Sequence, residues 1–260
     1  MPDVASHAPG TFSWPELATS DQKAGTAFYR DLFGWEVNDQ PMGPGETYTM
    51  FQMRGKPVAA AYTMRPEEKQ SGAPPHWNNY VTVKSADDST NKAQSLGGKV
   101  LAPPFDVMDV GRMAVLQDPT GAVFQVWEPK KHIGAMILGE PGALCWTELT
   151  TSDLKAAETF YTGLFGWSAK HGDAGGMEYT EMSNHGQPGV GMMPKPPGMP
   201  AHIPSYWMPY FMVTDVDASA AKAKGLGAKL MVPPQDIPNV GRFAIVSDPQ
   251  NAVFAIFKRP

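Results

Sequence analysis

The chain has 260 residues, of which 42% are hydrophobic and 18% are charged, and its formal net charge is −5. This composition is typical of a globular protein, and an acidic chain without a basic run argues against nucleic acid as a partner. The sequence lacks the ~20 consecutive apolar residues of a membrane helix, and its single cysteine, Cys145, cannot form an intrachain disulfide. We therefore expect a cytoplasmic protein with neither a nucleic-acid nor a membrane partner.

The first predicted elements are a strand at 12–17 and a helix directly after it. Ser20 or Asp21 can cap this helix, because a short polar side chain accepts a hydrogen bond from a free backbone N–H. Gly34 suits the end of the helix. Apolar residues recur between these points at the spacing of one helix face, at Ala24, Phe28 and Leu32. Three short strands are predicted next, near 35–37, 48–53 and 58–62.

The same order of elements then follows a second time. A strand is predicted at 80–83 and a helix at 86–96, which the glycines at 97 and 98 end. Three more strands follow, with a tight turn at Asp118–Gly121 between the last two, near 99–101, 112–117 and 122–127. The first half of the chain is therefore predicted to contain two β-α-β-β-β units.

The second half of the chain repeats the first. Residues 14–35 and 146–167 are identical at 14 of 22 positions, and residues 103–127 and 233–257 are identical at 12 of 25 positions. The two offsets, 132 and 130 residues, are nearly equal. A duplicated domain is therefore predicted, with the two halves related by a pseudo-twofold axis.

A combination of motifs in each half resembles a known superfamily. A strand that ends in "TSD" precedes a helix that ends in "FYxxLFGW", and "GRxxxxxDP" follows one unit later. This combination is similar to the vicinal oxygen chelate superfamily, which contains glyoxalase I, extradiol dioxygenases, and bleomycin- and fosfomycin-resistance proteins. The resemblance implies an α+β fold of two tandem domains, each of two paired β-α-β-β-β units that form a cup-shaped sheet. We place these domains at 8–130 and 143–260, with a linker at 131–142.

The same resemblance implies where metal ligands would lie. In the superfamily, His, Gln, Glu or Tyr side chains on the first and last strands of the units hold a metal ion inside the cup. Counting from the motifs gives the matching positions in this chain as Trp14, Asn78 and Gln125 in the first half and Trp146, Met208 and Ala255 in the second. An indole N–H has no lone pair for a metal, and Met and Ala offer little to a hard cation. We therefore expect no metal or other cofactor in the second cup, and at most a weakly held metal in the first.

Glu16 and Glu148 are the candidate catalytic residues. Each follows a tryptophan by two positions in a strand, so the Glu and the Trp should point to the same face. A carboxyl group in an aromatic cup has a raised pKa and can serve as an acid or a base. The alternative is a structural ion pair with Arg112 or Arg242, both of which the duplication retains. We expect the ion pair, which does not exclude a role in ligand binding.

Aromatic residues dominate the candidates for ligand binding. Trp14 and Trp146 are either ordinary core residues or a stacking wall for a flat ligand. The remaining candidates are Tyr48, Tyr179, Trp77, Trp207, Asn78, Gln125, Arg112 and Arg242. Few polar groups among apolar walls are typical of a small-molecule site.

Three functions remain open from the sequence. The first is binding of a small carbonyl or aromatic compound by a metal-independent lyase- or hydrolase-type detoxification enzyme. The second is sequestration of such a compound without turnover, and the third is a structural protein whose cups are filled by side chains. The expected partner is a small molecule, and the chain is expected to be a monomer or a homodimer.

Overall fold

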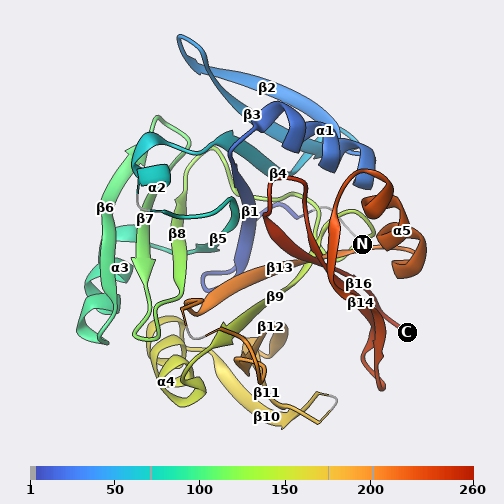
Figure 1. Cartoon of the computed structure of the whole chain (residues 1–260). Helices are drawn as coiled ribbons and strands as arrows, with labels where there is room; N and C mark the ends of the chain where they lie inside the picture. The colour runs from blue at the N-terminus through green and yellow to red at the C-terminus, as the bar shows by residue number, and fades with distance from the viewer. Residues whose placement is uncertain (1–3, 71, 175, 201) are drawn as a thin grey trace.

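The computed structural model describes residues 4–70, 72–174, 176–200 and 202–260, and it contains two mixed sheets of eight strands each (Figure 1). The first half of the chain consists of β1 (Phe12–Thr19), α1 (Gln22–Phe33), β2 (Glu36–Gly43), β3 (Glu46–Met53), β4 (Lys56–Thr63), α2 (Pro66–Gln70), β5 (His76–Thr82), α3 (Ala86–Ser95), β6 (Lys99–Val107), β7 (Gly111–Gln117) and β8 (Val123–Pro129). The second half consists of β9 (Leu144–Thr151), α4 (Leu154–Phe165), β10 (Ser168–Asp173), β11 (Glu178–Asn184), β12 (Gln187–Pro194), β13 (Tyr206–Met212), α5 (Val216–Gly225), β14 (Lys229–Ile237), β15 (Gly241–Ser247) and β16 (Val253–Lys258).

Each sheet is built from two βαβββ units that meet at their first strands. In the first sheet β1 pairs antiparallel with β5, β1 pairs parallel with β4, and β5 pairs parallel with β8. The same three relations join the corresponding strands of the second sheet. In Figure 1 the first sheet curves from β2 at the top to β6 at the left, and the second from β10 at the bottom to β14 at the right. We call their concave faces the first cup and the second cup. The predicted α+β fold of two tandem domains is confirmed.

The helix signals in the sequence also hold in the structure. Asp21 is the N-cap of α1, and its side chain accepts a hydrogen bond from the backbone N–H of Ala24 at 3.0 Å. Gly34 ends the helix with φ 74°, a left-handed conformation that glycine adopts without a steric penalty. In α4, Asp153 and Gly166 play the same two roles. The described residues include no helix that is long and apolar enough to cross a membrane.

The helices pack across the boundary between the two halves. Tyr29 of α1 lies against Phe254 of the second sheet with ring centroids 5.3 Å apart, and Tyr161 of α4 lies against Phe124 of the first sheet at 5.5 Å. All four side chains are buried. Each hydrophobic core therefore contains residues from both halves, so neither half has a complete core of its own.

Two reciprocal hydrogen bonds join the halves within these cores. Tyr29 Oη donates to Asp248 Oδ2 at 3.0 Å, and Tyr161 Oη donates to Asp118 Oδ2 at 3.0 Å. The other carboxylate oxygen of each aspartate accepts backbone N–H groups of its own turn, as expected for an Asp-Pro turn. Exchange of the two halves converts one contact into the other, as a pseudo-twofold axis requires.

Candidate functional site

A buried glutamate lies on the floor of each cup. Strand alternation places Glu16 on the same face of β1 as Trp14, and Glu148 on the same face of β9 as Trp146. Both glutamates are only 7% exposed. A buried carboxyl group needs hydrogen-bond partners, because it has lost its water.

Tyrosine hydroxyls supply those partners in both cups. In the first cup, Tyr48 donates to Glu16 Oε1 at 2.6 Å and Tyr80 donates to Glu16 Oε2 at 2.7 Å. In the second cup, Tyr210 donates to Glu148 Oε1 at 2.6 Å and Tyr179 donates to Glu148 Oε2 at 2.9 Å. The prediction that each Glu faces the inner side of its sheet is confirmed.

The tryptophans on the floor support these tyrosines. Trp14 Nε1 donates to Tyr48 Oη at 3.2 Å, and Trp146 Nε1 donates to Tyr179 Oη at 3.0 Å. Each cup thus contains a chain of hydrogen bonds from indole to phenol to carboxyl. These hydrogen bonds fix the orientation of all three side chains, because each polar group has a hydrogen-bond partner in its neighbour.

Burial raises the pKa of both Glu16 and Glu148, and the tyrosine hydroxyls oppose this shift only in part. Loss of water destabilises the charged carboxylate, whereas a hydrogen-bond donor stabilises it. The two carboxyl groups therefore retain a proton at higher pH than an exposed glutamate does. A carboxyl group with a raised pKa can serve as a proton donor or acceptor.

The first cup carries two amide side chains that the second cup has lost. Gln125 Nε2 donates to Asn78 Oδ1 at 2.7 Å, and the backbone N–H of Asn79 donates to Gln125 Oε1 at 3.0 Å. Asn78 Nδ2 donates to Tyr62 Oη at 3.1 Å. The matching positions of the second cup are the buried apolar residues Met208 and Ala255.

Comparison with known proteins identifies the family to which this geometry belongs. The model of the Glyoxalase/Bleomycin resistance protein/Dioxygenase superfamily matches residues 11–126 and 143–256. The chain belongs to this superfamily.

Two relatives of similar length match this sequence over almost its full length. A Mycobacterium tuberculosis protein named "Putative glyoxylase CFP32" is 40% identical over 259 residues, which cover 99% of this chain and 98% of that protein. The "Anthracycline biosynthesis protein DnrV" of Streptomyces peucetius is 34% identical over 265 residues, which cover 96% and 93%.

Solved structures of distant sequence show the same fold. The Mn(II)-bound glyoxalase from Novosphingobium aromaticivorans has a TM-score of 0.67 and 16% identity, covering 96% of this chain and 82% of its own. The 2,3-dioxygenase LapB from Pseudomonas sp. KL28 has a TM-score of 0.66 and 12% identity, covering 98% and 95%. At these identities the likeness concerns the fold alone.

The side chains on the cup floors do not fit the metal site that the superfamily resemblance implies. In the first cup both carboxylate oxygens of Glu16 accept phenol protons, and the amide oxygens of Asn78 and Gln125 already accept N–H groups. In the second cup Glu148 has only apolar neighbours at the matching positions. The described part of the chain contains no group of three or more His, Cys, Asp or Glu residues that could hold a metal ion.

The positions inferred by counting from the motifs need one correction. Counting from the motifs placed the ligand position of the first strand at Trp14 and the matching position of the second unit at Asn78. The strand register instead pairs Asn78 with Glu16, and Trp14 with Tyr80. Met208 is likewise opposite Glu148 rather than Trp146. The glutamate therefore occupies the centre of each floor.

Trp77 and Trp207, two of the candidates for ligand binding, do not line the cups. Each lies on the helix side of its sheet, where Trp77 Nε1 donates to Tyr29 Oη at 3.1 Å and Trp207 Nε1 donates to Tyr161 Oη at 2.8 Å. The physical reason is the two-residue period of a strand. Since Asn78 follows Trp77 directly in β5, the two side chains must point to opposite faces.

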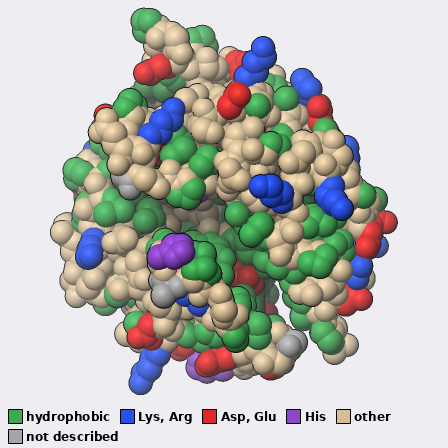
Figure 2. All heavy atoms as spheres, viewed as in Figure 1, with side chains coloured by type: hydrophobic (Ala, Val, Ile, Leu, Met, Phe, Trp, Pro, Cys, Tyr) green, Lys and Arg blue, Asp and Glu red, His purple; other side chains and the backbone are tan. Residues whose placement is uncertain are grey.

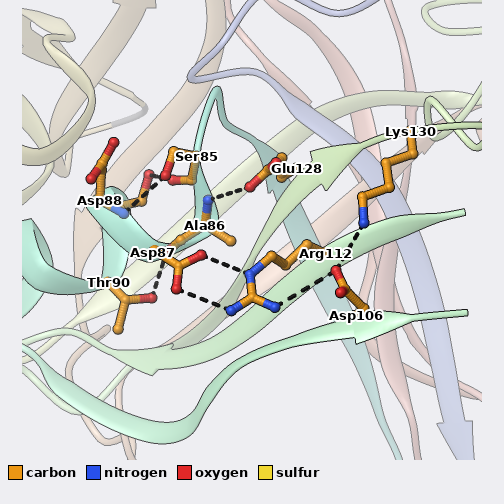
Figure 3. Close-up of polar contacts among 10 residues, drawn as sticks. Ser85, Ala86, Asp87, Asp88, Thr90, Asp106, Arg112, Glu128 and Lys130 are labelled. Atoms are coloured by element: carbon orange, nitrogen blue, oxygen red, sulfur yellow. Dashed lines mark hydrogen bonds and ion pairs between the residues drawn. The ribbon is translucent and has the colours of Figure 1, made fainter. Parts of the chain in front are cut away.

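The predicted contact between each Glu and an arginine is also wrong. Arg112 forms two hydrogen bonds with Asp87, at 2.7 and 3.0 Å, and lies 3.6 Å from Asp106, as Figure 3 shows. Arg242 contacts Asp217 and Asp236 in the same way.

These arginines do not reach the cup because successive side chains of a strand point to opposite faces of the sheet. Met113 and Phe243, the next residues in β7 and β15, face the cups, so Arg112 and Arg242 point outward to partly exposed carboxylates. These ion pairs connect α3 with β7 and α5 with β15, and they contribute little to stability because they are well solvated.

The sequence analysis missed Tyr80 and Tyr210, which donate the second hydrogen bond to each glutamate. A signal for them was present. Tyr80 and Tyr210 are related by the 130-residue offset, and each lies two positions after the floor residue, Asn78 or Met208, on the same face of the strand.

The linker between the halves closes one end of the first cup. The His132 ring lies between two cup tryptophans, with its centroid 4.5 Å from that of Trp14 and 5.9 Å from that of Trp127. Trp127 Nε1 donates to the backbone oxygen of His132 at 2.8 Å, and Ala135 packs among the cup residues. Burial lowers the pKa of His132 to about 4, so the ring is neutral.

The second cup is more open at the corresponding end. Trp14, Met113 and Trp127 are buried, whereas their counterparts Trp146, Phe243 and Phe257 are half-buried. Figure 2 shows a hollow on this face of the molecule, between β9–β12 below and β14–β16 at the right, with hydrophobic side chains around it and acidic side chains within it.

Proposed function

We propose that the protein binds a small organic molecule, an aromatic or carbonyl compound, on the floor of a cup through direct contact with its own side chains. One observation carries this proposal: in each half, a buried glutamate is fixed by two tyrosines and a tryptophan at the base of a concave, aromatic surface. An enclosed apolar wall with few fixed polar groups is the usual design of a small-molecule site.

The names of the relatives agree with this proposal. One is named a glyoxylase and another an anthracycline biosynthesis protein. Both names concern small molecules that contain carbonyl groups or aromatic rings. The donor set of the floor supports direct contact between protein and ligand, since its side-chain oxygens already accept hydrogen bonds from neighbouring groups.

The burial of the glutamate, which raises its pKa, supports a second candidate function, which is metal-independent catalysis of the lyase or hydrolase type. The raised pKa of Glu148 permits it to exchange a proton with a ligand that reaches the floor. Tyr179 and Tyr210 would hold its two oxygens in place during that exchange. Sequestration without turnover requires the same pocket but no proton transfer.

Binding and chemistry can be tested separately with simple probes. Isothermal titration with 2-naphthol and with phenylglyoxal tests binding to an aromatic and to a carbonyl compound. We expect at least one of these two compounds or the aromatic cation 4-aminoquinoline to bind, and absence of heat with all three would contradict the proposed function.

A second measurement decides between catalysis and sequestration. Proton NMR of a mixture with the bound probe shows over several hours whether the probe changes chemically. If it does, Glu148→Gln should abolish the change and retain binding, because an amide keeps the shape but cannot exchange the proton. An unchanged probe identifies a binding protein.

A further inference from the structure

The ring of His132 shows that the aromatic end of the first cup can hold a flat ring. Its flat ring meets the Trp14 indole edge to face, with an interplanar angle of 84°, and lies beside Trp127. The Nε2 atom of His132 is buried and has no hydrogen-bond partner among the described residues. The ring is therefore held by aromatic packing and by its own backbone, as a built-in occupant of the first cup.

The second cup presents the same walls without such an occupant among the described residues. Trp146 and Phe257 correspond to Trp14 and Trp127 through the duplication, and both are half-buried. The contact of the floor tyrosine with the wall is the same in both cups: ring centroids lie 6.3 Å apart for Tyr80 and Trp127, and 6.5 Å apart for Tyr210 and Phe257. The aromatic walls that hold His132 in the first cup are thus preserved in the second, where they are partly exposed.

A second difference between the cups concerns charge. Glu181 lies two residues after Tyr179 in β11, so it faces the second cup, and it is half-buried. The register places Glu181 opposite Gly191, and Gly191 opposite Glu148. At the usual strand spacing, the Cα atoms of the two glutamates are roughly 10 Å apart. The corresponding position in the first cup is Met50.

The carboxylate of Glu181 favours a ligand that carries positive charge. It forms no hydrogen bond or ion pair with a described residue. Lys170, its register neighbour on the outer strand β10, is exposed at the rim. An anionic ligand in the cup would be repelled by Glu181, whereas a cation would also gain from the faces of Trp146 and Phe257.

We propose that the second cup is the single ligand site of the chain, and that it takes a flat aromatic ring bearing a cationic amino group between Trp146 and Phe257. This inference rests on the proposed function and adds to it the choice of cup and the charge of the ligand. The first cup serves as a structural element, because the linker occupies the same slot there.

Three bicyclic compounds of similar ring area test the charge of the ligand. They are 4-aminoquinoline as the cation, 2-naphthol as the neutral compound and 2-naphthoate as the anion, each titrated at neutral pH. We expect one equivalent of 4-aminoquinoline per chain and an affinity at least tenfold above that of 2-naphthoate. Equal or tighter binding of 2-naphthoate would overturn the charge preference.

The same titrations separate failure of the inference from failure of the proposed function. If 2-naphthol binds and 4-aminoquinoline binds no more tightly than 2-naphthoate, the inference fails while the proposed function stands. If neither these bicyclic compounds nor phenylglyoxal binds, the proposed function fails as well.

Matched variants test which cup binds. Phe257→Ala should weaken 4-aminoquinoline about tenfold, because it removes one aromatic wall. Glu181→Gln should weaken it about fivefold and leave 2-naphthol unchanged, because it removes a partly solvated charge. Ile245→Ala in the second cup should weaken binding, whereas Val115→Ala at the corresponding position of the first cup should not. A loss of affinity in Val115→Ala alone, or two equivalents per chain, would overturn the assignment to the second cup.

Discussion

Replacement of His132 by Phe should make the protein more resistant to acid. The folded protein keeps this ring neutral, with a pKa of about 4, whereas an unfolded chain has the ordinary histidine pKa of about 6.5. The unfolded chain therefore binds a proton in a range where the folded chain does not. Stability from the neutral ring is fully present above pH 6.5 and is lost as the pH falls toward 4.

The size of this effect follows from the two pKa values. Between pH 7 and pH 4.5 the linkage relation gives a loss of about 2 kcal/mol for His132, at 1.36 kcal/mol per unit of pKa difference. Phe keeps the aromatic packing against Trp14 and removes a buried Nε2 that has no partner among the described residues. At pH 7 the variant should therefore be as stable as the natural chain, or slightly more so.

Urea unfolding at pH 7 and at pH 4.5, for both proteins, provides the measurement. Glu16 and Glu148 act in the opposite direction, because a raised carboxyl pKa makes the fold more stable as the pH falls. Their contribution is the same in both proteins and cancels in the difference. Equal losses of stability in the natural chain and in His132→Phe would refute the view that a buried neutral ring closes the first cup.

Further variants test other parts of the structure. Tyr161→Phe should cost about 3 kcal/mol in urea unfolding, because it removes the hydroxyl between Trp207 and Asp118 that joins the halves, and a cost below about 0.5 kcal/mol would contradict this role. Gly191→Ala should displace Tyr179 from Glu148, since the added Cβ would lie 1.8 Å from Tyr179 Oη. The control is Gly189→Ala, whose Cβ meets nothing within 4 Å. Equal near-ultraviolet circular dichroism of the two variants would contradict the prediction. Arg242→Ala should leave the urea midpoint nearly unchanged, because its ion pairs are solvated; a collapse of stability would indicate a role inside the cup.

The duplication made the fold predictable. Two matched blocks at nearly equal offsets fixed the tandem arrangement, and Asp21 and Gly34 marked the ends of the first helix because capping depends on residues close in sequence. The packing of Tyr29 on Phe254 was not predictable in this way, since no local pattern states which sheet a helix covers. The domain bounds 8–130 and 143–260 stay a prediction, and the shared cores lead us to expect that neither segment folds alone.

Only one property of the candidate site was predictable from the sequence, which is the face of the strand to which each side chain points. Alternation placed Glu16 beside Trp14 correctly, and applied more strictly it would have removed Trp77 and added Tyr80. The partners of Arg112 depend on which face of β7 meets α3, which is a tertiary property. The role of His132 was not predictable, because this residue lies in the linker, outside the two matched blocks.

The location of a bound ring tests the central claim most directly. A crystal structure of the protein with 4-aminoquinoline should show one ring between Trp146 and Phe257, with its amino group toward Glu181, and His132 still in place against Trp14. A ring bound in the first cup near Tyr48, or a ring bound outside both cups, would contradict the claim.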